Sequence, residues 1–131
     1  MRRDSGHPLT QLRVLVAEDE FFIADDLVNA LKAAGAIPVG PVSTPEEADE
    51  LLDEAGVDAA IFDINLRGSM AGEVALKAKE MKLPCIIVSG YSEAALPEAA
   101  RNIRRLEKPI DSSKIVQALT DELGMFGLVD R

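Results

Sequence analysis

Five polar side chains in this sequence each stand at the end of a short apolar run, and their types suit the handling of a phosphoryl group. They are three acids, one hydroxyl and one ammonium group: Glu18, Asp19, Asp63, Ser89 and Lys108. Aspartate can act as a covalent nucleophile towards phosphoryl groups. Phosphoryl transfer depends mainly on positioning and on charge neutralisation, which a lysine and a hydroxyl donor can supply. These types therefore suit a phosphoryl group carried on Asp63.

The three acids also predict a metal site, provided that the fold brings them together. Two unit charges about 4 Å apart cost about 4 kcal/mol at an effective dielectric constant of 20. Either the pKa values of such carboxyl groups rise, or a cation sits among them. Mg²⁺ binds one or two carboxylates, keeps several waters and accepts phosphate oxygens. Glu18, Asp19 and Asp63 are thus expected to form a Mg²⁺ site with room for phosphate.

The segments that must position these side chains alternate between apolar runs and amphipathic stretches. Apolar runs predict strands, and apolar positions at helical spacing predict helices. The expected strands cover residues 12–17, 37–42, 58–62, 85–88 and 104–106. The expected helices cover residues 20–34, 45–55, 73–81 and 111–123, with a short or broken helix at 92–103, where Pro97 interrupts the pattern. Two prolines in 37–42 favour an edge position for that strand.

Strands that alternate with helices predict a parallel sheet covered on both faces. We expect an α/β fold, the flavodoxin-like (βα)5 three-layer sandwich, with five parallel strands in the order 2-1-3-4-5. In this order ligands bind at the carboxyl ends of the strands, where the first and third strands are neighbours. The one domain is expected to span residues 12–124, with a flexible tail at 1–11 and a second tail at 125–131.

Each signal has an ordinary structural explanation when it is taken alone. Glu18-Asp19 could charge the first turn of a helix, and Asp63 could organise a turn. Ser89-Gly90 could be a plain turn, and Lys108-Pro109 a solvated strand end. What these explanations leave open is why all four segments fall on the same edge of one sheet.

Composition excludes several classes of function. The chain has 131 residues, a net charge of −9 and a pI of about 4.6. This charge argues against direct binding of nucleic acid, which needs clustered Lys and Arg, and against binding to an anionic membrane surface. The single cysteine, Cys85, fits a reducing compartment. With no apolar run of membrane-spanning length and no secretory signal at the start, we expect a cytoplasmic protein.

Four short motifs together resemble the response-regulator receiver family of two-component signalling. They are VLVAEDE at residues 14–20, FDINL at 62–66, VSG at 88–90 and EKP at 107–109. Each motif is weak alone, but together they are highly specific, and the resemblance extends from residue 12 to about residue 123. The resemblance implies that Asp63 is the phosphoacceptor. It also implies that Asp19 binds Mg²⁺ directly, that Glu18 holds the ion through water, and that Asn65 contributes its backbone carbonyl.

The resemblance also assigns a switch. Ser89 would be the hydroxyl that moves towards the phosphoryl oxygens, and Lys108, followed by a cis bond to Pro109, would pair with the phosphoryl group. The family usually carries Tyr or Phe three residues before this lysine, whereas this sequence has Arg105. A subgroup of stand-alone receivers lacks that aromatic residue. Tyr91 could replace it as a switch element, or could merely shield its loop.

By this resemblance the chain is a stand-alone receiver that takes a phosphoryl group from a histidine kinase or phosphotransfer protein. Phosphorylation would change partner binding at the face formed by residues 92–103, the strand 104–106 and the final helix. The protein would not be a turnover enzyme, and the sequence does not specify its downstream partner.

Two other classes stay open. One is a degenerate receiver that only binds proteins. The other is a small hydrolase with an aspartate nucleophile, although Asn65 stands where such enzymes place a second acid. A flavin carrier is disfavoured because Glu18-Asp19 would repel phosphate.

Overall fold

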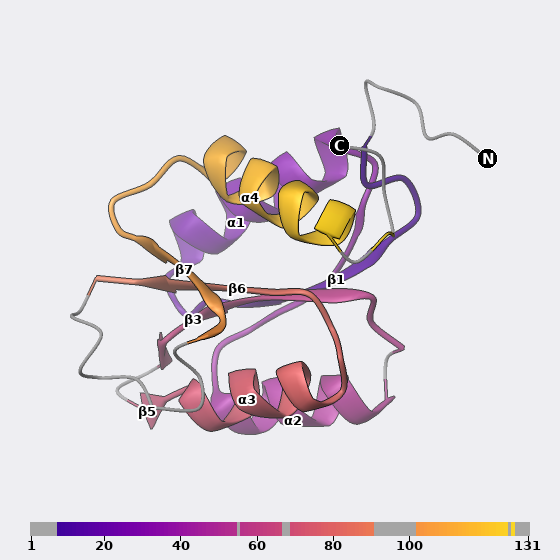
Figure 1. Cartoon of the computed structure of the whole chain (residues 1–131). Helices are drawn as coiled ribbons and strands as arrows, with labels where there is room; N and C mark the ends of the chain where they lie inside the picture. Colours follow the sequence, from indigo (N-terminus) through magenta and orange to yellow (C-terminus); the bar gives the residue numbers. More distant parts are fainter. Residues whose placement is uncertain (1–7, 55, 67–68, 91–101, 126, 128–131) are drawn as a thin grey trace.

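A five-stranded parallel sheet forms the centre of the protein (Figure 1). The computed structural model describes residues 8–54, 56–66, 69–90, 102–125 and 127. The strands of the sheet are β1 (Arg13–Ala17), β2 (Ile37–Val42), β3 (Ala59–Asp63), β6 (Cys85–Ser89) and β7 (Arg104–Glu107). They lie in the order β2-β1-β3-β6-β7, which confirms the predicted flavodoxin-like order 2-1-3-4-5.

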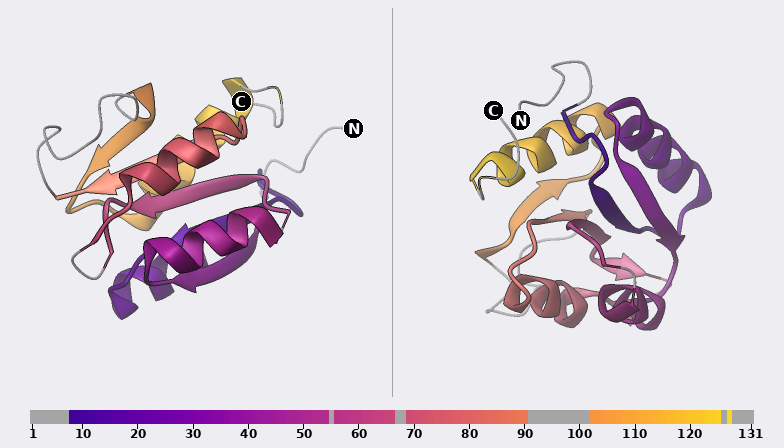
Figure 2. Two further views of the ribbon diagram at one scale, coloured as in Figure 1. Left: turned by 90° about the horizontal axis from the view of Figure 1, so that it is seen from below. Right: turned by 90° about the vertical axis from the view of Figure 1, so that its right-hand side faces the viewer.

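Helices cover both faces of the sheet and give three layers. They are α1 (Phe21–Ala33), α2 (Pro45–Glu54), α3 (Gly72–Glu80) and α4 (Ser112–Met125). α1 and α4 lie on one face, and α2 and α3 lie on the other, as Figures 1 and 2 show from three directions. The helix expected at 92–103 falls almost wholly outside the described residues. No helix in the described part of the chain has the length and apolar character needed to cross a membrane.

The two core clusters follow from the alternation of side chains along the central strands. In β3, Phe62 packs with the α2 and α3 side, while its neighbour Ile61 packs with the α1 and α4 side. All five residues of β3 and all five of β6 are buried. A strand that is apolar on both faces is typical of the centre of a parallel sheet.

The start of α2 shows how well local sequence determines some elements. The backbone N–H of Glu47 donates to Thr44 Oγ1 at 3.2 Å, and the Thr44 hydroxyl donates to Glu47 Oε1 at 3.1 Å. Glu47 Oε1 also accepts the backbone N–H of Ser43 at 3.3 Å, one residue earlier than in the usual capping box. The predicted helix start is thus confirmed, and β2 occupies the predicted edge position.

Three details differ from the sequence predictions. Residues 8–11 are not a flexible tail, because Leu9 is fully buried and its N–H donates to the carbonyl of Ala34 at 2.9 Å. Burial of a large apolar side chain outweighs the polar character of its neighbours. The last helix continues through Gly124 to Met125, because a glycine only weakens a helix and does not end it without help.

The third difference lies after β3, where the sequence predicts neither a strand nor a helix. Two short antiparallel strands occur there, β4 (Asn65–Leu66) and β5 (Ser69–Met70). They form a separate two-stranded sheet beside the central one. The pairing of two-residue strands has almost no signature in the sequence, so the prediction missed it.

Candidate functional site

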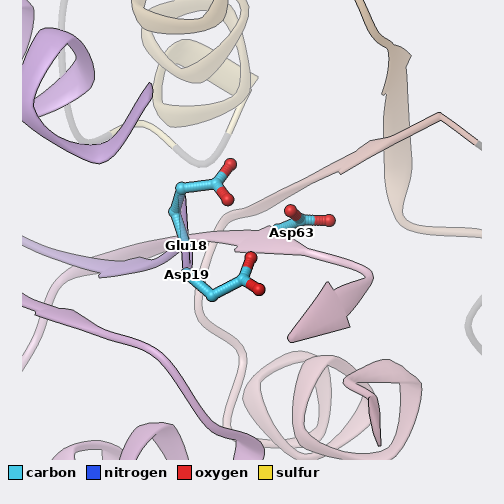
Figure 3. Close-up of side chains that lie close together, drawn as sticks. All are labelled: Glu18, Asp19 and Asp63. Atoms are coloured by element: carbon cyan, nitrogen blue, oxygen red, sulfur yellow. The ribbon is translucent and has the colours of Figure 1, made fainter. Parts of the chain in front are cut away.

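The three predicted acids meet at the carboxyl ends of neighbouring strands. β1 pairs with β3 so that Ala17 lies opposite Phe62, which places the residues after them side by side. Carboxylate oxygens of Glu18, Asp19 and Asp63 all lie within 4.8 Å of one another. Figure 3 shows the Asp19 and Asp63 carboxylates converging, while the Glu18 side chain extends towards the side of α1 and α4. The three acids thus lie together at the edge of the sheet where they were expected.

Backbone contacts with β2 fix the position of Glu18. Its N–H donates to the carbonyl of Val42 at 2.9 Å, which extends the pairing past the end of β1. Gly40, in β2, has a φ of +101°, and a Cβ atom there would come within 2.9 Å of the Val16 carbonyl oxygen. Only glycine adopts this conformation without strain in so narrow a space. The sequence therefore needs glycine at position 40 to bring β2 along the end of β1.

Lys108 completes the site from the neighbouring edge of the sheet. It directly follows β7, and its backbone N–H donates to the carbonyl of Ser89 at 2.9 Å. Its ammonium group donates to Asp63 Oδ2 at 2.8 Å and to Glu18 Oε1 at 3.1 Å. The peptide bond from Lys108 to Pro109 is cis, as the resemblance implied. The lysine thus lies among the acids, as a partner for Asp63 and Glu18.

The electrostatics of the site follow from burial and from these contacts. Burial, together with the nearby Asp63 carboxyl, raises the pKa of Glu18 to about 7, although the Glu20 N–H and Lys108 oppose this shift. Burial alone would lower the pKa of Lys108, but its hydrogen bonds and charge attraction to Asp63 and Glu18 outweigh burial, so its pKa is raised. Lys108 is therefore a permanent cation at neutral pH.

A polar hollow of about 620 Å³ opens over this edge of the sheet. The residues that line it are Glu18, Asp19, Glu20, Asp63, Asn65, Gly90 and Lys108. The donors are carboxylate oxygens, which match the preference of hard divalent cations, so the cluster can hold a metal ion. The backbone N–H of Asn65 donates to Asp63 Oδ1 at 3.0 Å and so orients the carboxylate.

Ser89 ends β6 and is buried, one position beyond Val88, which lies opposite Asp63. The structure therefore brings Ser89 to the predicted edge. Arg105 lies in β7 and is half-buried, while Tyr91, its suggested replacement as a switch, lies outside the described residues. Cys85, at the other end of β6, is no competing nucleophile, because burial raises the pKa of its thiol to about 12.

Sequence reasoning missed the part played by Glu20. Its backbone N–H donates to Glu18 Oε2 at 3.1 Å, and the residue lines the polar hollow. The available signal was the run of three acids, Glu18 to Glu20, directly before a helix. Only the first two acids of this run were assigned to the metal site, and Glu20 was given no role.

Comparisons with known proteins agree with this arrangement. A family model described as the response regulator receiver domain matches residues 14–120. Among curated relatives, the transcriptional regulatory protein PdtaR of Mycobacterium tuberculosis is 30% identical over 82% of this chain and 54% of its own length. The sensory transduction protein LytT of Bacillus subtilis is 31% identical over 82% of this chain and 46% of its own length. The chain thus spans about half the length of the curated relatives it matches.

Solved structures show the same fold. SdrG from Sphingomonas melonis Fr1 matches with a TM-score of 0.70 and 32% identity, over 88% of this chain and 98% of that one. A CheY-like receiver domain from Methanospirillum hungatei JF-1 matches with a TM-score of 0.78 over 88% of this chain and 96% of that one, and at 21% identity it supports the fold alone. With the family model covering most of the residues from β1 to α4, and with the acids and the lysine meeting at one edge of the sheet, the chain belongs to the response regulator receiver domain family.

Proposed function

We propose that Asp63 accepts a phosphoryl group from a phosphohistidine of a histidine kinase or phosphotransfer protein, in a Mg²⁺-dependent reaction. The observation that carries this proposal is the position of the Asp63 carboxylate. Lys108 Nζ lies 2.8 Å from its Oδ2, and carboxylate oxygens of Glu18 and Asp19 lie within 4.8 Å. A nucleophile, a permanent cation and a metal-binding donor set are thus joined in one hollow.

In the transfer step, one Asp63 carboxylate oxygen forms a bond to the phosphorus atom. The phosphorus–nitrogen bond of the phosphohistidine breaks, and its electron pair stays on the imidazole nitrogen. The product on this chain is an acyl phosphate on Asp63. The Lys108 ammonium group, which already donates to this carboxylate, is placed to donate to an oxygen of the bound phosphoryl group.

Asp19, Asp63 and the backbone carbonyl of Asn65 are the proposed direct ligands of the metal ion, and Glu18 is proposed to hold the ion through water. Bound Mg²⁺ would supply positive charge that offsets the charge on the phosphoryl oxygens. Glu18 must be ionised to assist metal binding. Because the pKa of its carboxyl is raised, this assistance depends on pH. Ser89 is proposed to donate its hydroxyl to a phosphoryl oxygen.

The added charge on Asp63 is proposed to bias the loops around the site between two states and so to change partner binding. The effect of the added charge is proposed to reach the partner-binding surface through β7 and α4. Lys108 lies between these two elements in the chain and donates a hydrogen bond to Asp63. We regard the chain as a phosphoacceptor in the cytoplasm and not as an enzyme that turns over a free substrate. That it works without a fused effector is also proposed, and SdrG, matched over 98% of its chain, supports this.

Labelling with a small acyl-phosphate donor tests the proposal. With acetyl phosphate and Mg²⁺, intact-mass measurement should show one added phosphoryl group on the wild type and none on Asp63→Asn. Asp25→Asn, which changes an exposed acid on α1, is the matched control and should label like the wild type. Equal labelling of wild type and Asp63→Asn would overturn the assignment, and labelling that persists in excess EDTA would overturn the role of Mg²⁺. Steady release of phosphate from a simple monoester would favour a hydrolase instead.

A further inference from the structure

A second hollow, mainly apolar, lies on the other side of Lys108 from the acidic hollow. It has a volume of about 680 Å³ and lies between the first turns of α1, the start of α4 and the ends of β3 and β6. Figure 1 shows α1 and α4 covering the same face of the sheet. Its apolar walls include Ile23, Ile61, Val88, Ile110 and Ile115. Hollows of about 300–1,000 Å³ with apolar walls and a few polar groups are typical small-molecule sites.

The charged groups on its wall are mostly acidic. They are Glu18, Asp26 and Asp63, against the single cation Lys108. Glu18 and Asp63 share that cation through their hydrogen bonds with it. The hydrogen-bond partner of Asp26 is neutral, since the Asp26 Oδ2 atom accepts the Ser112 hydroxyl at 2.7 Å, and no cationic side chain among the described residues forms an ion pair with Asp26. Asp26 therefore leaves an uncompensated negative charge at the mouth of an apolar hollow.

An exposed aromatic side chain borders the same mouth. Phe22 lines the hollow and is 78% exposed, and its ring lies 5.4 Å from that of Phe21 in an edge-to-face arrangement. The face of such a ring attracts cations as well as apolar groups. Phe22 and Asp26 lie four residues apart on α1, so they are neighbours on one side of the helix.

From these features we infer that the hollow binds a small amphipathic organic cation, with an aromatic or aliphatic body and an ammonium head. The body packs on the isoleucine walls and Phe22, and the head lies at Asp26. Lys108 sets this orientation, because its ammonium group repels a second cation at the opposite end. A single side chain from a docked protein would fill only a small part of the volume, so the size favours a separate molecule.

This inference goes beyond phosphoryl acceptance, since none of the contacts assigned to the ligand is needed for transfer to Asp63. The Asp63→Asn variant accepts no phosphoryl group but should still bind the ligand saturably, because the ligand's head lies at Asp26 and its body lies on the apolar walls. Failure of one proposal is thereby distinguishable from failure of the other.

Titration with four simple probes, followed in ¹H–¹⁵N NMR spectra of the full chain, tests the inference. The probes are 2-phenylethylammonium, the matched anion 3-phenylpropionate, neutral 2-phenylethanol and methylammonium. Saturating Mg²⁺ is present throughout, so that an organic cation gains nothing by entering the acidic hollow. We expect saturable shifts of amides in α1 and at the start of α4 with 2-phenylethylammonium, and an affinity about tenfold above that of the anion.

Two variants separate the hollow from general attraction by an acidic protein. Asp26→Asn keeps an oxygen that accepts a hydrogen bond from Ser112, so the contact between α1 and α4 can persist. This variant should lower the affinity for 2-phenylethylammonium about three- to fivefold. Asp25→Asn removes the neighbouring exposed charge and should leave the affinity unchanged within about twofold. Equal losses in both variants, equal binding of the anion, or equal binding of methylammonium would overturn the inference. Absence of saturable binding would also overturn it.

Discussion

Asp63 and Lys108 meet in one site, but they come from strands with opposite surroundings. β3, which carries Asp63, lies in the centre of the sheet between β1 and β6, and all its residues are buried. β7, which precedes Lys108, lies at the edge, pairs only with β6, and consists of exposed or half-buried residues. The proposed nucleophile thus ends one of the two fully buried strands, and its cationic partner follows an edge strand.

This difference indicates how one site can be both rigid and responsive. Packing on both sides of the sheet fixes Asp63 before any ligand binds, which a reacting group requires. Lys108 is positioned mainly by polar contacts within the site, namely those with Asp63, Glu18 and the Ser89 carbonyl. A change of charge on Asp63 would therefore act directly on Lys108, and the strand that precedes Lys108 pairs with β6 alone.

The largest expected effect is on the central strand. Phe62→Ala removes a fully buried ring next to Asp63 and should lower the free energy of unfolding by about 3–5 kcal/mol, because a cavity remains in the core. Urea denaturation followed by circular dichroism measures this loss. Leu106→Ala, at a half-buried position in the edge strand, is the matched comparison and should cost less. Equal losses of unfolding free energy in the two variants would contradict the difference in constraint between β3 and β7.

The next effect concerns Lys108, which follows the edge strand, and the proposed labelling of Asp63. Lys108→Ala should slow labelling of Asp63 by acetyl phosphate about a hundredfold, since loss of one well-placed charge partner typically costs that much. Binding of Mg²⁺ should strengthen at the same time, because the variant removes a cation beside Glu18 and Asp63. Lys114→Ala, which removes an exposed lysine on α4, is the control for net charge. Slow labelling that is explained by weak Mg²⁺ binding would contradict the role given to Lys108.

A smaller effect is expected from pH, through Glu18. Its pKa is raised from 4.5 to about 7, so in the metal-free protein the protonated form is favoured by folding. The stability from this group is fully present below about pH 4.5 and is lost as pH rises through about 7. A metal ligand must be ionised, so the affinity for Mg²⁺ should rise about tenfold between pH 6 and pH 8.

Calorimetric titration of Mg²⁺ at several pH values measures this dependence. Glu18→Gln should flatten the profile, because the group that titrates is gone. Glu20→Gln changes the charge of an exposed neighbour that lines the same hollow and should keep the profile. A profile that stays steep in Glu18→Gln would assign the titration to another group.

The same contrast explains which features the sequence could predict. The ends of the central strands were predicted to within about one residue, because a short continuous apolar run is typical of a buried strand. The site residues were predictable because parallel strands bring their carboxyl ends to one edge, whatever separates them along the chain. The helix start expected at residue 45 also follows a local rule, because Thr44 supplies a capping side chain and an acid stands three residues after it.

What the sequence could not show depends on contacts between distant residues. The burial of Leu9 beneath residues near Ala34 has no local signature, so residues 8–11 were assigned to a tail. The apolar hollow arises from the spacing between α1 and α4, which no periodicity encodes. Charged residues in β7 made that strand difficult to recognise, although an edge strand tolerates such residues and can even benefit from them.

The smallest expected effect is at the position where relatives usually carry an aromatic residue. Arg105 lies opposite Ile87 in the register of β7 and β6, so the two positions compare an edge strand with its buried neighbour directly. Arg105→Ala should change the free energy of unfolding by no more than about 1 kcal/mol, as is usual for charged residues near the surface. Ile87→Ala, at a fully buried position, should cost about 2–5 kcal/mol. Labelling of Asp63 in Arg105→Ala should stay within about twofold of wild type, because no contact of Arg105 is assigned to the transfer step. A large loss of labelling at unchanged stability would instead show that this arginine acts on the site. The edge strand would then be coupled to the acids through more than Lys108.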